Sequence, residues 1–215
     1  MIDLVLVAAS GLAREVIAAD QDTYRIVGIL DDNSELHGRI IDGVEVLGGI
    51  DLVAAMDESL LVCVGSGVGR RRIVARIGAM GVGADRYATV IEASVRIPSG
   101  CEVGRGSILL GGSVLTADVT VGDHVVVMPN TTLAHDDVVE DYVTLAAGVA
   151  LGGTVLVRTG AYLGMNAGVR ERTTIGRDSV VGMGSVVLTD VPDGETWVGV
   201  PAAPITARSR MADRR

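Results

Sequence analysis

His135 and Asp136 are adjacent, and of all neighbouring side chains in the chain this pair best suits proton transfer. Histidine has an ordinary pKa of about 6.5, in the range that a general base needs. A carboxylate beside it can hold the imidazole in one tautomer and increase its basicity. The pair therefore predicts a general base, against the alternative that a turn histidine is simply solvated. The other histidines, His37 and His124, are expected to be ordinary loop and turn residues.

Composition excludes several classes of function. The 215-residue chain contains no Lys, so all 18 basic residues are Arg and Schiff-base chemistry through a lysine amine is excluded. Its formal net charge of −9 argues against nucleic acids and anionic membranes as partners, because both require a basic protein surface. The N-terminus has no basic signal-peptide segment and no apolar run reaches the length of a membrane span, so a cytoplasmic location is expected. Cys63 and Cys101 are isolated in apolar contexts and are expected to be buried, reduced thiols.

A six-residue repeat must position His135. Ile, Leu or Val occupies every sixth residue from Ile91 to Val187, 17 times without an insertion. A second position, two residues earlier, is mostly small or β-branched, as at Ser107 and Val119. Six is not a helical period, and the abundant Gly, Thr and Val are poor helix formers. The repeat predicts short strands, three to a triangular coil of 18 residues, stacked as a left-handed parallel β-helix.

The coil length also predicts what surrounds His135. Ala117 and Gly153 lie one coil before and after it, and both are small enough to leave open space beside the imidazole. His124 and His135 do not supply three convergent ligands within one coil, so no metal site is expected. Glycines often follow the aliphatic position, and we attribute them to turns that need positive φ. They are Gly104, Gly122, Gly152, Gly164, Gly176 and Gly182.

Residues 1–88 lack the repeat and alternate strand-like with helix-like segments. This order predicts a small Rossmann-like α/β domain with a parallel sheet and right-handed crossovers. The β-helix is expected over 89–205, and the Arg-rich residues 206–215 are expected to form a flexible tail. The expected strands are Ile2–Ala8, Arg25–Leu30 and Ser59–Val64, and the expected helices are Leu12–Asp20 and a segment that begins near Arg70.

A nucleotide site is one interpretation of the N-terminal domain. The turn Ser10–Gly11 follows the first strand, and the acidic pair Asp31–Asp32 follows the second, as in folds that bind a nucleotide across the strand ends. The segment Ala9–Ala13 does not contain the full glycine fingerprint. A purely structural α/β cap is therefore the alternative.

Segments that run nearly from end to end of the chain carry a family resemblance. They are Ala9–Val16, Val27–Asp32, Gly43–Gly48, the repeat with Ala134-His135-Asp136, and Trp197–Ala202. Together they resemble the hexapeptide-repeat sugar acetyltransferases of the sialic acid O-acetyltransferase (NeuD) and UDP-amino-sugar N-acetyltransferase (PglD) type.

The resemblance implies an acetyl-CoA-dependent acetyltransferase that modifies an amino or hydroxyl group of a nucleotide-linked sugar. It implies a homotrimer with active sites between subunits, no metal, His135 as general base and Asp136 as the group that raises its basicity. Backbone near Gly153 would face the thioester oxygen. The implied acetyl-CoA contacts are Thr144, Gly153, Met165 and Gly182, and the implied nucleotide-sugar contacts are Ser10, Gly11, Asp31, Asp32 and Gly65.

The chain departs from this family at three positions. Leu12 and Thr144 stand where the family usually has His, and Met128 stands where it often has Asn. A different class of function is a catalytically silent trimer that binds a nucleotide-sugar and regulates or scaffolds a biosynthetic enzyme. A metal-dependent hydratase on the same prism would need three histidines that converge. Transfer from acetyl-CoA to a sugar distinguishes the first possibility from the other two.

Overall fold

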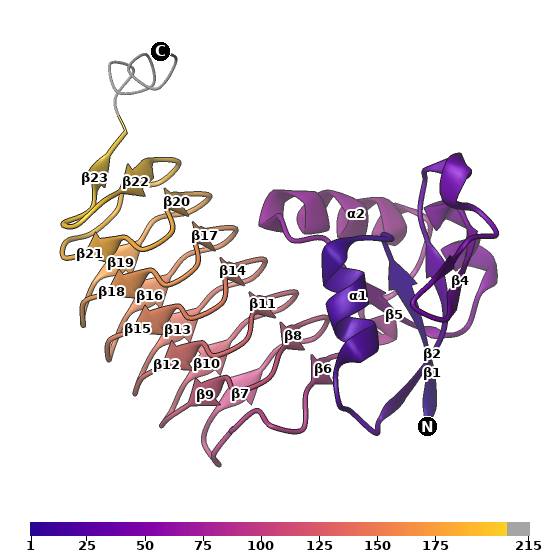
Figure 1. Ribbon diagram of the computed structural model, residues 1–215, viewed down its shortest axis with the longest axis horizontal. Helices are drawn as coiled ribbons and strands as arrows, with labels where there is room; N and C mark the ends of the chain where they lie inside the picture. The colour runs from indigo at the N-terminus through magenta and orange to yellow at the C-terminus, as the bar shows by residue number, and fades with distance from the viewer. Residues whose placement is uncertain (206–215) are drawn as a thin grey trace.

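The computed structural model describes residues 1–205, and these form two parts (Figure 1). The N-terminal part is a small α/β domain, and the C-terminal part is a left-handed parallel β-helix whose coils stack away from it. Both parts confirm the predicted fold class. The predicted flexible tail, 206–215, lies outside the described residues. Within residues 1–205, no helix combines the length and the apolar character that a membrane span requires.

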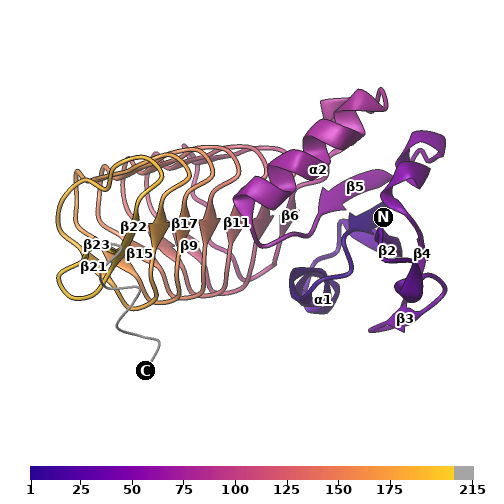
Figure 2. The same cartoon turned by 90° about the horizontal axis from the view of Figure 1, so that it is seen from above.

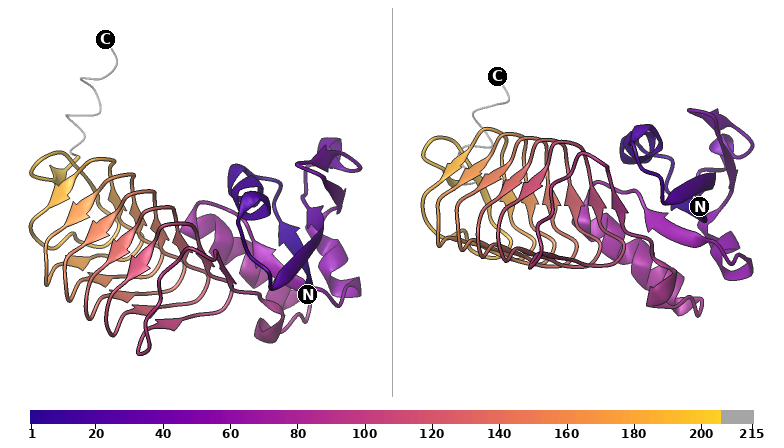
Figure 3. Two further views of the ribbon diagram at one scale, coloured as in Figure 1. Left: turned by 60° about the horizontal axis from the view of Figure 1, so that its bottom comes forward. Right: turned by 90° about the horizontal axis from the view of Figure 1, so that it is seen from below.

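The N-terminal domain is built on a five-stranded sheet of order β3-β4-β2-β1-β5. Strands β4, β2, β1 and β5 are parallel, as predicted, and the hairpin strand β3 is antiparallel. The two α-helices lie on opposite faces of the sheet (Figures 2 and 3). The elements are β1 (Ile2–Val7), α1 (Gly11–Ala18), β2 (Tyr24–Leu30), η1 (Ser34–Leu36), β3 (Ile40–Ile41), β4 (Val44–Gly48), η2 (Ile50–Ala55), β5 (Ser59–Val62), α2 (Gly67–Ala79) and η3 (Ala84–Arg86).

Alternation along β1 explains why its sequence is a continuous apolar run. Leu4 and Leu6 are buried in a cluster with α1, whereas Val5 and Val7 are buried in a cluster with α2. Successive side chains of a strand point to opposite faces, so a strand covered by helices on both sides needs apolar residues throughout.

Three parallel sheets form the walls of the β-helix. Each strand pairs with strands 18 residues away, as in the register Val126–Thr144 and Val127–Leu145. The strands are β6 (Val90–Ile91), β7 (Glu102–Val103), β8 (Ile108–Leu109), β9 (Val114–Leu115), β10 (Thr120–Val121), β11 (Val126–Val127), β12 (Thr132–Leu133), β13 (Val138–Val139), β14 (Thr144–Leu145), β15 (Ala150–Leu151), β16 (Leu156–Val157), β17 (Tyr162–Leu163), β18 (Gly168–Val169), β19 (Thr174–Ile175), β20 (Val180–Val181), β21 (Val186–Val187), β22 (Thr196–Val198) and β23 (Ala203–Pro204).

The repeat positions point inward, as predicted. Every sixth residue from Leu109 to Val187 is at most 5% exposed, and the first three members, Ile91, Ile97 and Val103, pack against the same core. The second position, two residues earlier, is also buried along the prism. Because this core uses short branched side chains, the near absence of aromatic residues follows from the architecture.

The explanation offered for the repeat glycines is wrong. Positive φ recurs three residues after the aliphatic position, at Asp118, Asn130 and Asp136 among others, and not at the glycines that directly follow it. Those glycines are required by packing instead: a Cβ on Gly152 would lie 2.6 Å from the backbone N of Glu171 in the next coil. Close stacking of coils, rather than turn conformation, therefore selects glycine there.

Arg70 fastens the N-terminal domain to the β-helix. Its side chain is fully buried at the start of α2 and donates hydrogen bonds to the carbonyls of His124, Tyr142 and Val143 in two successive coils. It also donates to the carbonyls of Val64 and Gly65 and to Thr144 Oγ1. Burial lowers the pKa of Arg70 to about 10, so the group remains charged at neutral pH.

Candidate functional site

The His135 turn follows β12 and presents the imidazole to solvent. His135 Nδ1 lies 2.7 Å from Asp136 Oδ2, and the His135 side chain is 66% exposed. Asp136 adopts a φ of 61°, which turns the chain so that its carboxylate reaches back to the ring. With Nδ1 engaged by the carboxylate, Nε2 is the nitrogen left to exchange a proton with another molecule.

Gly153 lies directly beside the His135 ring in the next coil. A Cβ at Gly153 would lie 2.5 Å from His135 Cε1 and 2.9 Å from Cδ2, closer than van der Waals contact permits. The backbone holds the two turns together, because Thr154 N donates to the His135 carbonyl at 2.8 Å. The small neighbour predicted from the 18-residue spacing thus gives the imidazole its space.

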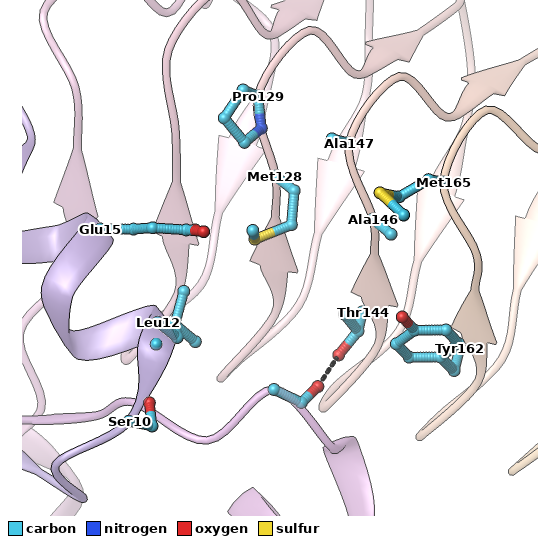
Figure 4. Close-up of a pocket in the computed structure, with 12 residues that line it drawn as sticks. Ser10, Leu12, Glu15, Met128, Pro129, Thr144, Ala146, Ala147, Tyr162 and Met165 are labelled. Carbon is cyan, nitrogen blue, oxygen red and sulfur yellow. Dashed lines mark hydrogen bonds between the residues drawn. The ribbon is translucent and has the colours of Figure 1, made fainter. Parts of the chain in front are cut away.

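A cavity of about 550 Å³ lies between the N-terminal domain and the β-helix (Figure 4). Leu12 and Glu15 of α1 point toward Met128 of the β-helix across it. Glu15 is its only charged lining residue, and burial raises the pKa of this carboxyl. The lining residues are Ser10, Gly11, Leu12, Glu15, Gly65, Met128, Pro129, Thr144, Ala146, Ala147, Tyr162 and Met165.

Five of the expected contact residues meet in this cavity. Ser10, Gly11 and Gly65 come from the N-terminal domain, and Thr144 and Met165 come from the β-helix. Ser10 caps α1, since its Oγ accepts a hydrogen bond from Ala13 N. The sequence gave no direct signal that segments so far apart would line one cavity.

Thr144 joins the two domains. Its Oγ1 donates to the Gly65 carbonyl at 2.7 Å and accepts from Arg70, and the residue is 3% exposed. The hydroxyl is thus engaged within the protein, where a histidine would be too large for the same contact. The expectation that Thr144 contacts acetyl-CoA stays a prediction.

The remaining expected contacts lie outside the cavity. Asp31 accepts from Ala9 N, and Asp32 pairs with Arg76, which lowers the pKa of the Asp32 carboxyl. Gly153 lies beside His135, and Gly182 packs against Val198. Their roles toward substrate or acetyl-CoA stay predictions.

Asp137 and His124 acquire features that the sequence argument missed. Asp137 occupies the inward position two residues before Val139, is 0% exposed, and has a pKa that burial raises to about 7. His124 lies in a turn as expected but is buried, stacked on Tyr142 at a ring distance of 5.2 Å. Cys63 is buried, whereas Cys101 is partly exposed. Residues 1–205 contain no group of three or more His, Cys, Asp or Glu placed to hold a metal ion.

Comparisons with known proteins agree with this geometry. Residues 3–77 match the PglD N-terminal domain family. The acetyltransferase domain of PglB from Neisseria gonorrhoeae has a TM-score of 0.85 and 27% identity, covering 95% of this chain and 100% of that one. PerB from Caulobacter crescentus, solved with CoA and GDP-perosamine, has a TM-score of 0.84 and 26% identity, covering 95% and 97%.

Curated sequences match over shorter stretches. The UDP-3-O-acylglucosamine N-acyltransferase of Methylorubrum extorquens is 30% identical over 162 residues, 68% of this chain and 46% of that protein. The enzyme of the same name from Caulobacter sp. is 33% identical over 112 residues, 45% of this chain and 33% of that protein. The chain thus spans between a third and half of the length of these curated relatives.

The triangular prism of hexapeptide coils, with a histidine-carboxylate pair at one turn, defines the chain as a hexapeptide-repeat acyltransferase. The α/β domain at its N-terminus narrows the assignment. The chain belongs to the hexapeptide-repeat sugar acetyltransferases that carry a PglD-type N-terminal domain.

Proposed function

We propose that the chain transfers an acetyl group from acetyl-CoA to an amino or hydroxyl group of a nucleotide-linked sugar, with His135 as the general base. The observation that carries the proposal is the 2.7 Å contact between His135 Nδ1 and Asp136, which leaves Nε2 free at an exposed turn. Neighbouring structures support the substrate classes: PglB was solved with acetyl-CoA, and PerB with CoA and GDP-perosamine. A cytoplasmic location is part of the proposal, because both substrates are soluble, charged metabolites.

The reaction is a direct acyl transfer. His135 Nε2 accepts the proton of the acceptor N–H or O–H as its lone pair attacks the thioester carbonyl carbon. The tetrahedral oxyanion needs a hydrogen-bond donor, and backbone near Gly153 is the candidate. The C–S bond then breaks, CoA leaves, and the proton on His135 neutralises the departing thiolate. No covalent intermediate on the enzyme is required.

The cavity is the proposed acceptor site. It is lined mainly by apolar side chains and has no Arg or His in its lining. The phosphates of a nucleotide-sugar therefore need backbone N–H groups near Ser10 and Gly11 or must lie outside the cavity. Glu15 favours an amino-sugar over a hydroxyl acceptor, because its carboxylate can attract the ammonium form.

A homotrimer completes the proposed site. His135 follows β12, whereas the cavity lies beside β11, β14 and β17, which belong to a different wall of the prism. No residue of the His135 turn lines the cavity. A neighbouring subunit that presents its His135 to this cavity would unite base and acceptor.

The test is thiol release from acetyl-CoA with a panel of UDP-, GDP-, dTDP- and CMP-linked sugars. His135→Ala should lower kcat by about 10²–10⁴-fold and remain trimeric, because it removes only general-base catalysis. His37→Ala is the matched control and should keep full activity, since His37 contacts the Asp31 carbonyl away from the cavity. Unchanged turnover in His135→Ala would refute the mechanism. Nucleotide-sugar binding without any transfer would favour the silent scaffold.

Mixed oligomers test the shared site. Ala147→Trp should fill the cavity, and this variant and His135→Ala should each be inactive alone. Assembled together at equal amounts, random trimers should recover about a quarter of wild-type activity, because a quarter of the interfaces pair two intact halves. No recovery would contradict a site between subunits.

A further inference from the structure

The ladder of hydrogen bonds between coils is broken at the His135 turn. At every sixth residue from Gly104 to Arg170 the backbone N–H donates to the carbonyl 17 residues further on, with the exception of Ala134. Ala134 N donates instead to Asp137 Oδ2 at 2.7 Å. The pairing of β12 with β15 is correspondingly reduced to Thr132–Ala150.

The second oxygen of Asp137 replaces another main-chain bond. Residues at positions equivalent to Val155, such as Val149 and Ala161, donate their N–H to the carbonyl three residues earlier. Val155 N donates to Asp137 Oδ1 at 2.8 Å. One buried carboxyl therefore joins the turn of His135 to the turn of Gly153, the residue that lies against the imidazole.

A carboxyl at this position is an exception within its column. The equivalent inward positions carry small or hydroxyl side chains, and Ser179 donates its hydroxyl to the Gly176 carbonyl in the ordinary way. A hydroxyl would let Ala134 N return to the Leu151 carbonyl. The anionic carboxyl costs free energy to bury, so its presence beside the candidate base calls for a compensating function.

We propose that Asp137 is a positioning residue, which accepts the two diverted N–H groups and thereby fixes the His135 imidazole against Gly153. The inference rests on the proposed function of His135. The charged groups that face Asp137 are His135 and Asp136. An ionised Asp137 also favours the proton that His135 holds during transfer, and it does so without touching substrate.

Asp137→Ser tests the proposal, because serine is native to this column and should restore the regular ladder. The expected result is a fall in kcat on the order of 10²-fold with an unchanged KM for acetyl-CoA, since the base is misplaced by about 1 Å. The double variant with His135→Ala should be no slower than His135→Ala alone. Ser179→Ala, a change in the same column away from His135, should retain wild-type kcat.

A second measurement does not depend on activity. In methyl- and imidazole-resolved NMR, the order parameter of the His135 Cε1–H bond should fall from about 0.8 to below about 0.6 in Asp137→Ser. Wild-type kcat and an equally rigid ring in Asp137→Ser would overturn the proposal. A wild-type protein that transfers no acetyl group but shows the loss of ring order would refute the proposed function and leave the positioning role standing.

Discussion

Replacing Gly153 with alanine would test whether the imidazole orientation matters for catalysis. The new Cβ would lie 2.5 Å from His135 Cε1 and 2.9 Å from Cδ2, whereas ordinary contact begins at 3.4 Å. The ring must therefore move by about 1 Å, a displacement that can lower a rate by about 10²-fold. The backbone N–H of residue 153 is retained, so a donor to the oxyanion is not removed.

Stability should change little in this variant. Gly153 does not adopt a positive φ, and the exposed His135 side chain can swing into solvent, so we expect a cost below about 1 kcal/mol. Gly168→Ala is the matched control, because nothing lies within 4 Å of the added Cβ. The assay is steady-state thiol release with each variant, together with a thermal melt. Wild-type kcat in Gly153→Ala would show that the position of the ring does not limit the reaction.

Three further predictions concern charged groups. Arg70→Met should lower the free energy of unfolding by more than about 3 kcal/mol in urea titrations, because five carbonyls lose a buried donor, whereas the exposed Arg72→Met should have little effect. Glu15→Gln should raise KM for an amino-sugar acceptor about tenfold and leave KM for acetyl-CoA unchanged; an equal KM would remove Glu15 from acceptor binding. The folded pKa of Asp137, about 7, exceeds its ordinary 3.8, so wild-type stability should fall relative to Asp137→Ser by up to about 4 kcal/mol as pH rises from about 4 to 7. Parallel unfolding curves across this range would contradict the raised pKa.

The β-helix could be predicted because its repeat tolerates no insertion. A constant period of six assigns each residue to the inside, a wall or a turn, and a period of 18 assigns its neighbours above and below. The prediction that Gly153 lies beside His135 follows from that arithmetic alone. The same register places Asp137 inside the prism, so a carboxyl in a column of small and hydroxyl side chains was a signal available in the sequence.

The contacts between the domains could not be predicted in this way. Arg70 and Thr144 are 74 residues apart and meet only because α2 docks against the coils. Neither residue type indicates such a contact: Arg70 appears in the sequence as part of a basic helix start, and Thr144 as one more β-branched strand residue. The purpose of the repeat glycines was also inaccessible, because spacing does not report the sign of φ.

Exceptions to a regular scaffold locate its chemistry better than the regular part does. A uniform prism can satisfy its backbone with main-chain bonds alone, so a buried side chain that replaces such bonds adds a cost without adding a wall. Asp137 does this beside His135, and Arg70 does it where the cavity meets the β-helix. The two exceptions occupy neighbouring coils but different corners, which is the arrangement expected if one subunit supplies the base and its neighbour the acceptor cavity.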